Sequence, residues 1–293
     1  MDWKECVQKM IDYIENNLKE DLTLSEVSMN IGYSQFYCSK AFHAQAGICM
    51  KDYIRMRRIS SAALQIRDTQ KRILDIALEY GYNSQEAFTR SFIDVFDITP
   101  AAYRRLQKPI PLFIRRYVNT DHQHNKIGDD FTMQEKYMKD VKVTFITKPA
   151  RRMLVWYKNG ATNYHELCDT EGAHEIWGLM ESIKGTLGGV IAAWLNENGR
   201  TRYVWGVEMP ADYKGPIPDG FECIDTPECQ YVKFCHPPYE ESEHEEVTEA
   251  VWNKSELWNP KDFNMEWNDA SNPVYEDDRA DEGYLVLKPV KKI

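Results

Sequence analysis

The chain has 293 residues, of which 43% are hydrophobic and 12% aromatic, and its formal net charge is −10 at pH 7. This length is enough for two domains of ordinary size, and the composition excludes the disordered and fibrous classes. No apolar run approaches the roughly 20 residues of a membrane-spanning helix, and the acidic N-terminal stretch does not resemble a signal peptide. We therefore expect a cytoplasmic protein with no membrane partner.

Charge is divided unevenly along the chain. Residues 1–118 contain 17 Lys and Arg against 14 Asp and Glu, whereas the remainder contains 19 against 32. Seven of the eight tryptophans lie in the acidic part. This difference indicates two modules with different partners.

The seven cysteines are scattered over the chain and include no Cys-x-x-Cys pair. An odd number at this spacing argues against a disulfide framework and against a zinc ribbon. Cys229, Cys235 and His236 are close in sequence, but they lie along one predicted strand. Buried thiols are therefore favoured over metal ligands. We expect no metal and no cofactor.

Two segments of the first hundred residues resemble each other. With Gly32 and Gly81 as anchors, LSEVSMNIGY parallels ILDIALEYGY, and CSKAFHAQAGICMKDYIR parallels FTRSFIDVFDITPAAYRR. In each copy a short amphipathic helix, 24–31 or 73–80, ends at the glycine, and a polar residue after the turn can cap a second helix. This is a helix-turn-helix pattern, whose second helix can enter a DNA major groove about 12 Å wide.

The second helix of each copy places polar side chains opposite an apolar face. In the first copy the inner face is Cys38, Ala41 and Phe42. Glutamine can pair with adenine, arginine with guanine, and glutamate with the cytosine amino group. An ordinary solvated helix face would explain one such copy, but two copies in the same frame favour base contact. The predicted contacts with double-stranded DNA are Gln35, Phe36, Ser39, Lys40, His43, Gln85, Glu86, Thr89 and Arg90.

A longer helix is predicted between the copies, over MKDYIRMRRISSAALQIRD. Such a helix can hold the two units about 34 Å apart, one turn of DNA. Arg55, Arg57 and Arg58 near its start either contact phosphates or are solvated surface charges.

Residues 1–107 resemble the DNA-binding domain of the AraC/XylS transcription regulators. The segment ILDIALEYGYNSQEAFTRSFIDVFDITPAAYRR carries the family's Gly-Tyr turn, paired phenylalanines and final Pro-x-x-Tyr-Arg. The resemblance implies a seven-helix domain that sets two recognition helices in successive major grooves. Phe36 and Lys40 stand where relatives often have tryptophan and arginine, and Glu86 and Ala87 where they often have glutamine and threonine. The DNA sequence that this chain recognises therefore cannot be inferred from the operators of its relatives.

A different pattern follows a predicted linker or docking strand over 108–138. Over 139–293, alternating runs such as VKVTFITK and RMLVWYKNG are typical of strands, and helices are predicted over 173–186 and 240–257. The order strand-strand-helix-strand-strand occurs twice. We therefore predict a multidomain protein, with an all-α double helix-turn-helix domain followed by an α+β domain of duplicated units and a pocket at their seam.

Aromatic side chains and acids suggest what such a pocket binds. Aromatic faces attract cations, most strongly beside a carboxylate, and an unpaired carboxylate in an aromatic cleft would be costly without a ligand. About half of the rings are expected to be core, and strand-end solvation is the alternative for the two glutamates. The predicted effector-binding residues are Trp177, Trp194, Trp205, Glu208, Tyr231, Glu282 and Tyr284.

Residues 139–293 resemble the GyrI-like effector-binding domain, and the whole chain is similar to Rob-type regulators. The segments that carry this resemblance are YVWGVE, PDGFECIDTPECQYVKF and the terminal EGYLVLKPV. The resemblance implies that amphipathic, often cationic, small molecules bind between the two halves, near an acidic residue of the last strand. Glu282 fits that position.

These features predict a sequence-specific transcription regulator, an activator by resemblance, that responds to a small-molecule effector. RNA polymerase is a further candidate partner. The rival class is an enzyme, since some GyrI-like domains are credited with hydrolysing small electrophiles and a Glu–Tyr pair could act as base and acid. An architectural DNA-binding protein without effector explains the aromatic content of the second module poorly.

Overall fold

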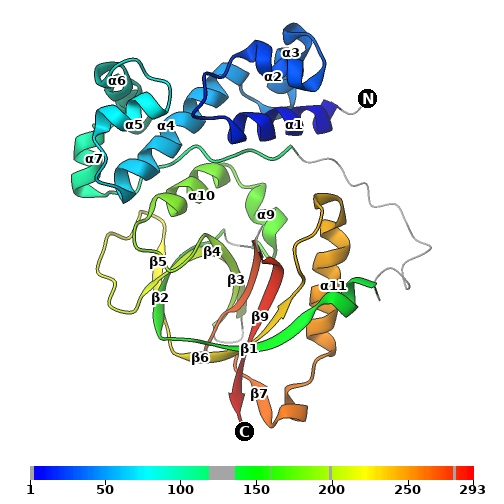
Figure 1. The fold of residues 1–293 in the computed structure, drawn as a ribbon. Helices are drawn as coiled ribbons and strands as arrows, with labels where there is room; N and C mark the ends of the chain where they lie inside the picture. The colour runs from blue at the N-terminus through cyan, green and yellow to red at the C-terminus, as the bar shows by residue number, and fades with distance from the viewer. Residues whose placement is uncertain (1–2, 119–135, 159, 198–199, 280–281) are drawn as a thin grey trace. The chain divides into compact units, whose positions relative to one another are not determined.

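The computed structural model describes residues 3–118, 136–158, 160–197, 200–279 and 282–293 (Figure 1). The chain divides into two compact units. The first unit comprises Met1–Gln123 together with His174–Lys184, and the second comprises His124–Ala173 together with Gly185–Ile293. Within the described residues, no helix is sufficiently long and apolar to traverse a lipid bilayer.

The described part of the first unit is helical. Its helices in chain order are α1 (Trp3–Asn16), α2 (Leu24–Ile31), α3 (Gln35–Ala46), α4 (Met50–Asp68), α5 (Ile73–Glu79), α6 (Gln85–Phe96), α7 (Pro100–Leu106) and α10 (Ala173–Ser182). Figure 1 shows α4 running between the pair α2–α3 and the pair α5–α6. The unit therefore contains two helix-turn-helix segments joined by one long helix.

Local signals set the boundaries of α2 and α3. The backbone N–H of Glu26 donates to the Thr23 hydroxyl at 3.2 Å, and the Glu26 carboxylate accepts from the N–H of Thr23 at 2.8 Å, forming a capping box. Gly32 ends α2 with φ of 80°, a left-handed conformation that favours glycine. Ser34 caps α3 by accepting from a backbone N–H. The helix predicted over 24–31 is confirmed.

Each helix-turn-helix copy is built around its own aromatic core. Phe42 of α3 packs edge-on against Tyr53 of α4, with ring centroids 5.4 Å apart. In the second copy, Phe92 of α6 contacts Phe96 and Tyr103 at 4.9 and 5.8 Å. These rings are buried, and each such burial contributes roughly 1.5–3 kcal/mol. The paired phenylalanines of the repeat are therefore core residues that fix the orientation of α3 and α6.

The beginning of the predicted linker or docking strand docks on the first unit. Ile110 and Leu112 are buried in the core of the second copy, and the N–H of Phe113 donates to the Ser60 hydroxyl at 2.8 Å. Alternating apolar residues let this extended segment bury one side, which a solvated linker would not do. Residues 119–135 of the predicted linker lie outside the described residues.

Helix α10 packs in the first unit, although the sequence assigned it to the second module. The N–H of Ile110 donates to the buried Ser182 hydroxyl at 2.9 Å. A Cβ added to Gly178 would lie 1.8 Å from the carbonyl oxygen of Leu112, so the two backbones touch where only glycine fits. Arg67 of α4 donates to the carbonyl oxygen of Glu181 at 2.7 Å, which satisfies one of the free carbonyls at the end of α10.

The second unit is built on one antiparallel sheet. Its strands pair in the order β1-β6-β9-β8-β3-β4-β2-β5, and β7 pairs with β9. The strands are β1 (Lys142–Lys148), β2 (Arg151–Trp156), β3 (Ile191–Glu197), β4 (Arg200–Pro210), β5 (Glu222–Thr226), β6 (Cys229–Cys235), β7 (Met265–Trp267), β8 (Val274–Arg279) and β9 (Gly283–Lys292). The seven cysteines of the chain are free thiols.

The sheet contains two sets of strands that exchange their edge strands. Along the chain, β1 and β2 precede α9 (Tyr164–Cys168), α10, β3 and β4, whereas β5 and β6 precede α11 (His244–Leu257), β8 and β9. Short 3₁₀ turns at Glu241–Glu243 and Pro260–Phe263 flank α11. β1 of the first set pairs with β6 of the second, and β5 of the second pairs with β2 of the first. Each set therefore supplies one edge strand to the other.

Candidate nucleic-acid interface and ligand site

The face of α3 that was predicted to contact DNA is at the surface. Phe36 is 72% exposed, and Gln35, Lys40 and His43 are also exposed, while Ser39 is half-buried. Opposite them, Cys38 and Phe42 are buried in the core of the copy, with Ala41 packed beside it. This helix therefore presents one continuous polar and aromatic face to solvent.

Helix α6 presents an equivalent face. Gln85, Glu86 and Arg90 are exposed and Thr89 is half-buried, whereas Phe88 and Phe92 are buried. The pKa of Glu86 is lowered by backbone and Ser84 hydrogen bonds at the beginning of the helix, which favours the ionised form. An ionised carboxylate there can accept a hydrogen bond from a cytosine amino group but repels phosphate.

The three arginines of α4 have different environments. Arg57 is buried against Glu15, with Nε 2.8 Å from the carboxylate, and also donates to the carbonyl oxygen of Phe113. Arg58 donates to the carbonyl oxygens of Leu18 and Glu20 at 2.8 and 2.7 Å. Both are structural, because these contacts hold α4 to neighbouring segments.

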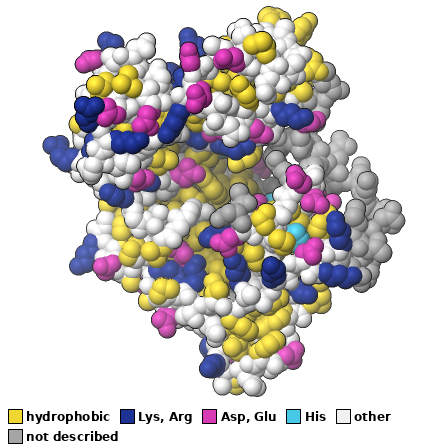
Figure 2. Space-filling view, viewed as in Figure 1, with side chains coloured by type: hydrophobic (Ala, Val, Ile, Leu, Met, Phe, Trp, Pro, Cys, Tyr) yellow, Lys and Arg dark blue, Asp and Glu magenta, His cyan; other side chains and the backbone are white. Residues whose placement is uncertain are grey.

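Arg55 is the member of this group that reaches solvent. Its side chain is 45% exposed and lies 3.5 Å from Asp52. Together with Arg90 and Asp94 of α6 it lines an open cavity of about 650 Å³ between α4 and α6. Figure 2 shows basic and acidic side chains interspersed on the face in view, without one uniformly basic surface. Of these three arginines, Arg55 is therefore the one placed to contact a phosphate.

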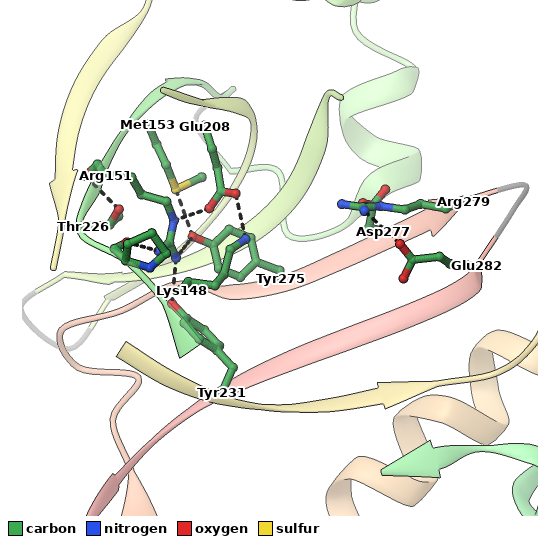
Figure 3. A network of polar contacts seen from close by, with 11 residues as sticks. Lys148, Arg151, Met153, Glu208, Thr226, Tyr231, Tyr275, Asp277, Arg279 and Glu282 are labelled. Carbon is green, nitrogen blue, oxygen red and sulfur yellow. Dashed lines mark hydrogen bonds and ion pairs between the residues drawn. The ribbon is translucent and has the colours of Figure 1, made fainter. Parts of the chain in front are cut away.

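Two predicted ligand residues, Glu208 and Tyr231, lie in a self-contained polar network (Figure 3). Arg151 is buried and pairs with Glu208, and it also donates to the hydroxyls of Tyr275 and Tyr231 at 2.9 and 3.4 Å. Lys148 lies 2.7 Å from the second carboxylate oxygen of Glu208. The expectation of an unpaired carboxylate at Glu208 is wrong, because two cations from β1 and β2 neutralise it.

This pairing controls the ionisation of the network. Burial opposes ionisation of Glu208, but Lys148 and Arg151 outweigh it and keep its pKa below the ordinary value. Burial also opposes ionisation of Lys148 and so lowers its pKa, and the attraction of Glu208 partly offsets that change. Breaking one partner would leave a buried charge, which costs several kcal/mol. Each charge of the network therefore depends on its partners, and the polar groups are already satisfied.

Two further predicted ligand residues also lie elsewhere. Glu282, just before β9, pairs with Lys233 and lies 3.4 Å from Arg279, and it remains 39% exposed. These cations lower its pKa. Trp177 lies on α10 in the first unit, where its indole N–H donates to Glu181 at 3.0 Å. Glu282 is therefore a paired surface carboxylate, and Trp177 belongs to the first unit, whereas the other predicted ligand residues belong to the second.

The remaining predicted residues share one face of the sheet with a glutamate that the sequence did not single out. Glu276 of β8 and Trp205 of β4 both lie opposite Ala192 of β3, and Trp194 lies two residues further along β3. Because residues in register and two apart along a strand share a face, these side chains project to the same side. Tyr284 joins them, since it lies opposite Asp278 of β8.

Glu276 is held by aromatic hydroxyls. Tyr203 donates to one carboxylate oxygen, and Tyr284 donates to the other at 2.8 Å. The indole N–H of Trp252 on α11 donates in turn to the Tyr284 hydroxyl at 2.9 Å. Burial raises the pKa of Glu276, although these hydrogen bonds oppose the shift. The arrangement is a carboxyl group among aromatic rings, with His244 as the charged side chain that acts on it electrostatically.

The sequence contained only a weak signal for this residue. Alternation along NPVYEDD places Glu276 and Tyr275 on opposite faces, but three acids in succession give no basis for choosing among them. Its partners come from β4, β9 and α11, which are far apart in sequence. In the described part of the chain, no group of His, Cys, Asp and Glu side chains is arranged to hold a metal ion.

Comparison with known proteins identifies relatives over part of this chain. A family model described as a helix-turn-helix domain matches residues 12–106. Over 99 residues, or 34% of this chain, the sequence is 40% identical to the TetD protein of transposon Tn10 from Escherichia coli, and the match covers 72% of TetD. Over 104 residues, or 36% of the chain, it is 36% identical to the regulatory protein SoxS of E. coli K12, covering 97% of SoxS.

A longer match is to the transcriptional regulator Rob of Salmonella typhimurium. It is 39% identical over 136 residues, which is 44% of this chain and 47% of Rob. The chain thus spans about half the length of Rob and nearly all of SoxS.

Proposed function

Since the chain belongs to the AraC/XylS family of helix-turn-helix transcription regulators, we propose that α3 and α6 read DNA bases and that the second unit binds a small amphipathic effector that alters transcription. The protein is a DNA-binding regulator by this membership. The proposal concerns the residues that contact DNA bases, the effector, and a contact with RNA polymerase.

The exposed faces of α3 and α6 carry the DNA part of the proposal. Both faces follow the same turn geometry, and each has groups that can bind base edges at its beginning. Arg90 is the side chain best suited to a two-pronged contact with guanine, while Lys40 supplies a point charge. Because the unit carries few excess positive charges, specific binding should be strongly dependent on salt.

Fluorescence anisotropy with promoter fragments tests this part. Arg90→Ala should weaken specific binding by about 10- to 100-fold and relax the preference at one base pair. Lys291→Ala, which removes an equal charge from the exposed end of β9, is the matched control and should leave affinity unchanged. Binding by the wild-type protein that is indifferent to sequence at physiological salt would reject the specific-regulator assignment.

The carboxyl of Glu276 carries the effector part. A buried carboxyl with a raised pKa is costly to ionise alone, so a cation brought among the same rings would favour its ionised form. Three residues that the sequence predicts as effector contacts lie on the same face of the sheet, namely Trp194, Trp205 and Tyr284. A lipophilic cation with an aromatic body fits this chemistry.

Isothermal titration with tetraphenylphosphonium tests the effector site. Glu276→Gln should weaken binding by about tenfold or more, since it removes the charge and keeps the shape. Glu282→Gln is the matched control, because that carboxylate is already neutralised by Lys233 and Arg279. Equal effects of the two substitutions would reject Glu276 as the ligand carboxylate.

A hydrolase remains the second candidate function, because Glu276 and Tyr203 form a carboxyl–phenol pair of the kind used in acid–base catalysis. Incubation of the full chain with small electrophiles decides between the two. Multiple turnovers that Glu276→Gln abolishes would establish the enzyme, and binding without turnover would support the regulator.

Helix α10 offers a physical link between effector and DNA. Residues 174–184 belong to the first unit, while the chain on both sides of them belongs to the second. An effector can change DNA affinity only by binding two states of the protein unequally. We take α10 as the candidate element that differs between such states, because the chain connects both of its ends directly to the second unit.

A further inference from the structure

A lysine ammonium occupies an aromatic cage in the second unit. The Nζ atom of Lys288, on β9, lies 5.6 Å from the ring centroid of Trp252 on α11 and 5.5 Å from that of Trp267 on β7. It also pairs with Glu256. The Lys288 side chain is 13% exposed, whereas Glu256 is 69% exposed. The ammonium is thus held by two indole faces and one carboxylate at the edge of solvent.

The cage opens into a cavity of about 480 Å³. A third indole, Trp194, and the carboxylate of Asp269 also line it. The volume is within the range of small-molecule sites, which are mostly apolar with a few placed polar groups. Among the described residues that line the cavity, Lys288, Glu256 and Asp269 are ionisable. Their formal charges sum to −1, and the sum becomes −2 when the lysine ammonium leaves the cavity.

This cavity is distinct from the Glu276 site. Trp194 and Trp252 contact each other with centroids 5.0 Å apart, and Glu276 is not among the residues that line the cavity. The indole N–H of Trp252 donates to Tyr284 at 2.9 Å, which is the partner of Glu276, while the face of the same ring lies toward Lys288. The cavity therefore shares Trp194 and Trp252 with the Glu276 site but not the Glu276 carboxyl itself.

We propose that the cavity is a second binding site, for an organic ammonium ion with an apolar body, and that Lys288 is its built-in competitor. Indole faces attract cations, and recognition of quaternary ammonium groups by aromatic cages is a common use of this attraction. The resident lysine shows the cation position. Its four-carbon stem is flexible, so the ammonium can move into water toward exposed Glu256 while the tryptophans stay in place.

The alternative is that Lys288 only covers apolar surface with its stem and fixes α11 to β9 through Glu256. The two interpretations differ in what removal of the ammonium does. A purely structural lysine leaves no cation site when it is replaced, whereas a competitor leaves a vacant one. Lys288→Met keeps the length and the apolar stem and removes only the charge.

The decisive experiment is calorimetric titration of the full chain with benzyltrimethylammonium. Lys288→Met should tighten binding about tenfold, and adding Trp267→Leu to that variant should remove the gain, because one cage wall is lost. Neopentylbenzene, which has the same shape without charge, is the matched ligand control and should bind the two Lys288 forms alike. Unchanged or weaker binding of the cation to Lys288→Met would overturn the inference.

A second variant separates this inference from the proposed effector site. In the Lys288→Met background, Glu276→Gln should leave the affinity for benzyltrimethylammonium unchanged. If it removes the gain instead, the cation binds at Glu276, and the inference is wrong while the effector proposal stands. Thermal unfolding of each variant confirms that the fold is retained, and Lys288→Gln replaces Lys288→Met if the latter does not fold.

Discussion

Helices α10 and α11 occupy the same place in the order of elements but pack against different parts of the protein. Each follows two strands and precedes further strands, which are β3 and β4 for α10 and β7, β8 and β9 for α11. α11 packs on β9 and β6, where Val247, Ala250 and Val251 are buried. α10 belongs to the first unit, in contact with the extended segment that follows α7. The position of a helix in a repeated order therefore does not determine which core it joins.

The surfaces of the two helices explain the difference. α11 buries a stripe of β-branched and small side chains against a sheet, which requires a broad apolar face. α10 instead brings Gly178 against the backbone at Leu112 and directs the Ser182 hydroxyl to a backbone N–H. Contact with a single extended strand of chain needs only a narrow face with a gap for the backbone.

The largest effect is expected at Gly178. Gly178→Val puts a branched side chain where even a Cβ would lie 1.8 Å from the Leu112 carbonyl oxygen, so α10 must separate from the segment. We expect the free energy of unfolding of the first unit to fall by about 3 kcal/mol, since the clash outweighs the roughly 1 kcal/mol gained by removing a helix glycine. Chemical denaturation followed by circular dichroism measures this.

Gly188→Ala is the matched control for this substitution. No atom lies within 4 Å of the position where its Cβ would be added. We expect a change of less than about 0.5 kcal/mol in unfolding free energy. If Gly178→Val were equally mild, α10 would not be packed in the first unit and the contrast with α11 would disappear.

A smaller effect is expected from the core of α11. Val251 is completely buried against the sheet, so Val251→Ala removes two methyl groups and should lower the unfolding free energy of the second unit by about 2 kcal/mol. The affinity for DNA should remain unchanged, since α3 and α6 are in the other unit. A loss of DNA affinity in Val251→Ala would show that α11 also supports the helix-turn-helix unit.

The sequence predicted the two helix-turn-helix copies well because their signals are local. Thr23, Glu26, Gly32 and Ser34 each act on residues within four positions, so the boundaries of α2 and α3 follow directly. The faces of α3 and α6 follow from helical period alone. No distant contact was needed to predict these features.

The sequence could not assign α10, or choose among the acids of the second unit, because both depend on distant partners. Glu208 is neutralised by Lys148 and Arg151, whose approach depends on how β1, β2 and β4 lie in the sheet. Glu276 instead accepts hydrogen bonds from aromatic residues of β4 and β9. Alternation gives the face of a strand but does not identify what lies opposite.

A further distinction between the helices concerns single hydrogen bonds. Ser182→Ala removes the acceptor of the buried N–H of Ile110 and leaves that donor without its partner. An unsatisfied buried donor costs about 1–2 kcal/mol, which should lower the unfolding free energy of the first unit. Ser255→Ala is the control on α11, because that hydroxyl donates only within its own helix, to the carbonyl oxygen of Trp252. A loss from Ser255→Ala as large as that from Ser182→Ala would contradict the assignment of the contact.

The last prediction concerns pH and the face of the sheet that α11 covers. Burial raises the pKa of Glu276 above its ordinary value near 4.5, so the folded protein retains a proton that the unfolded chain has lost. Stability falls with rising pH wherever the folded state binds more protons. The unfolding free energy of the second unit should therefore decrease as pH rises from about 4.5 through the raised pKa, and Glu276→Gln should remove this part of the slope. Gly178→Val should leave the slope unchanged, since α10 belongs to the first unit and Glu276 to the second. Denaturation of the three proteins across this pH range measures the slope, and an unaltered slope in Glu276→Gln would mean that another group titrates there.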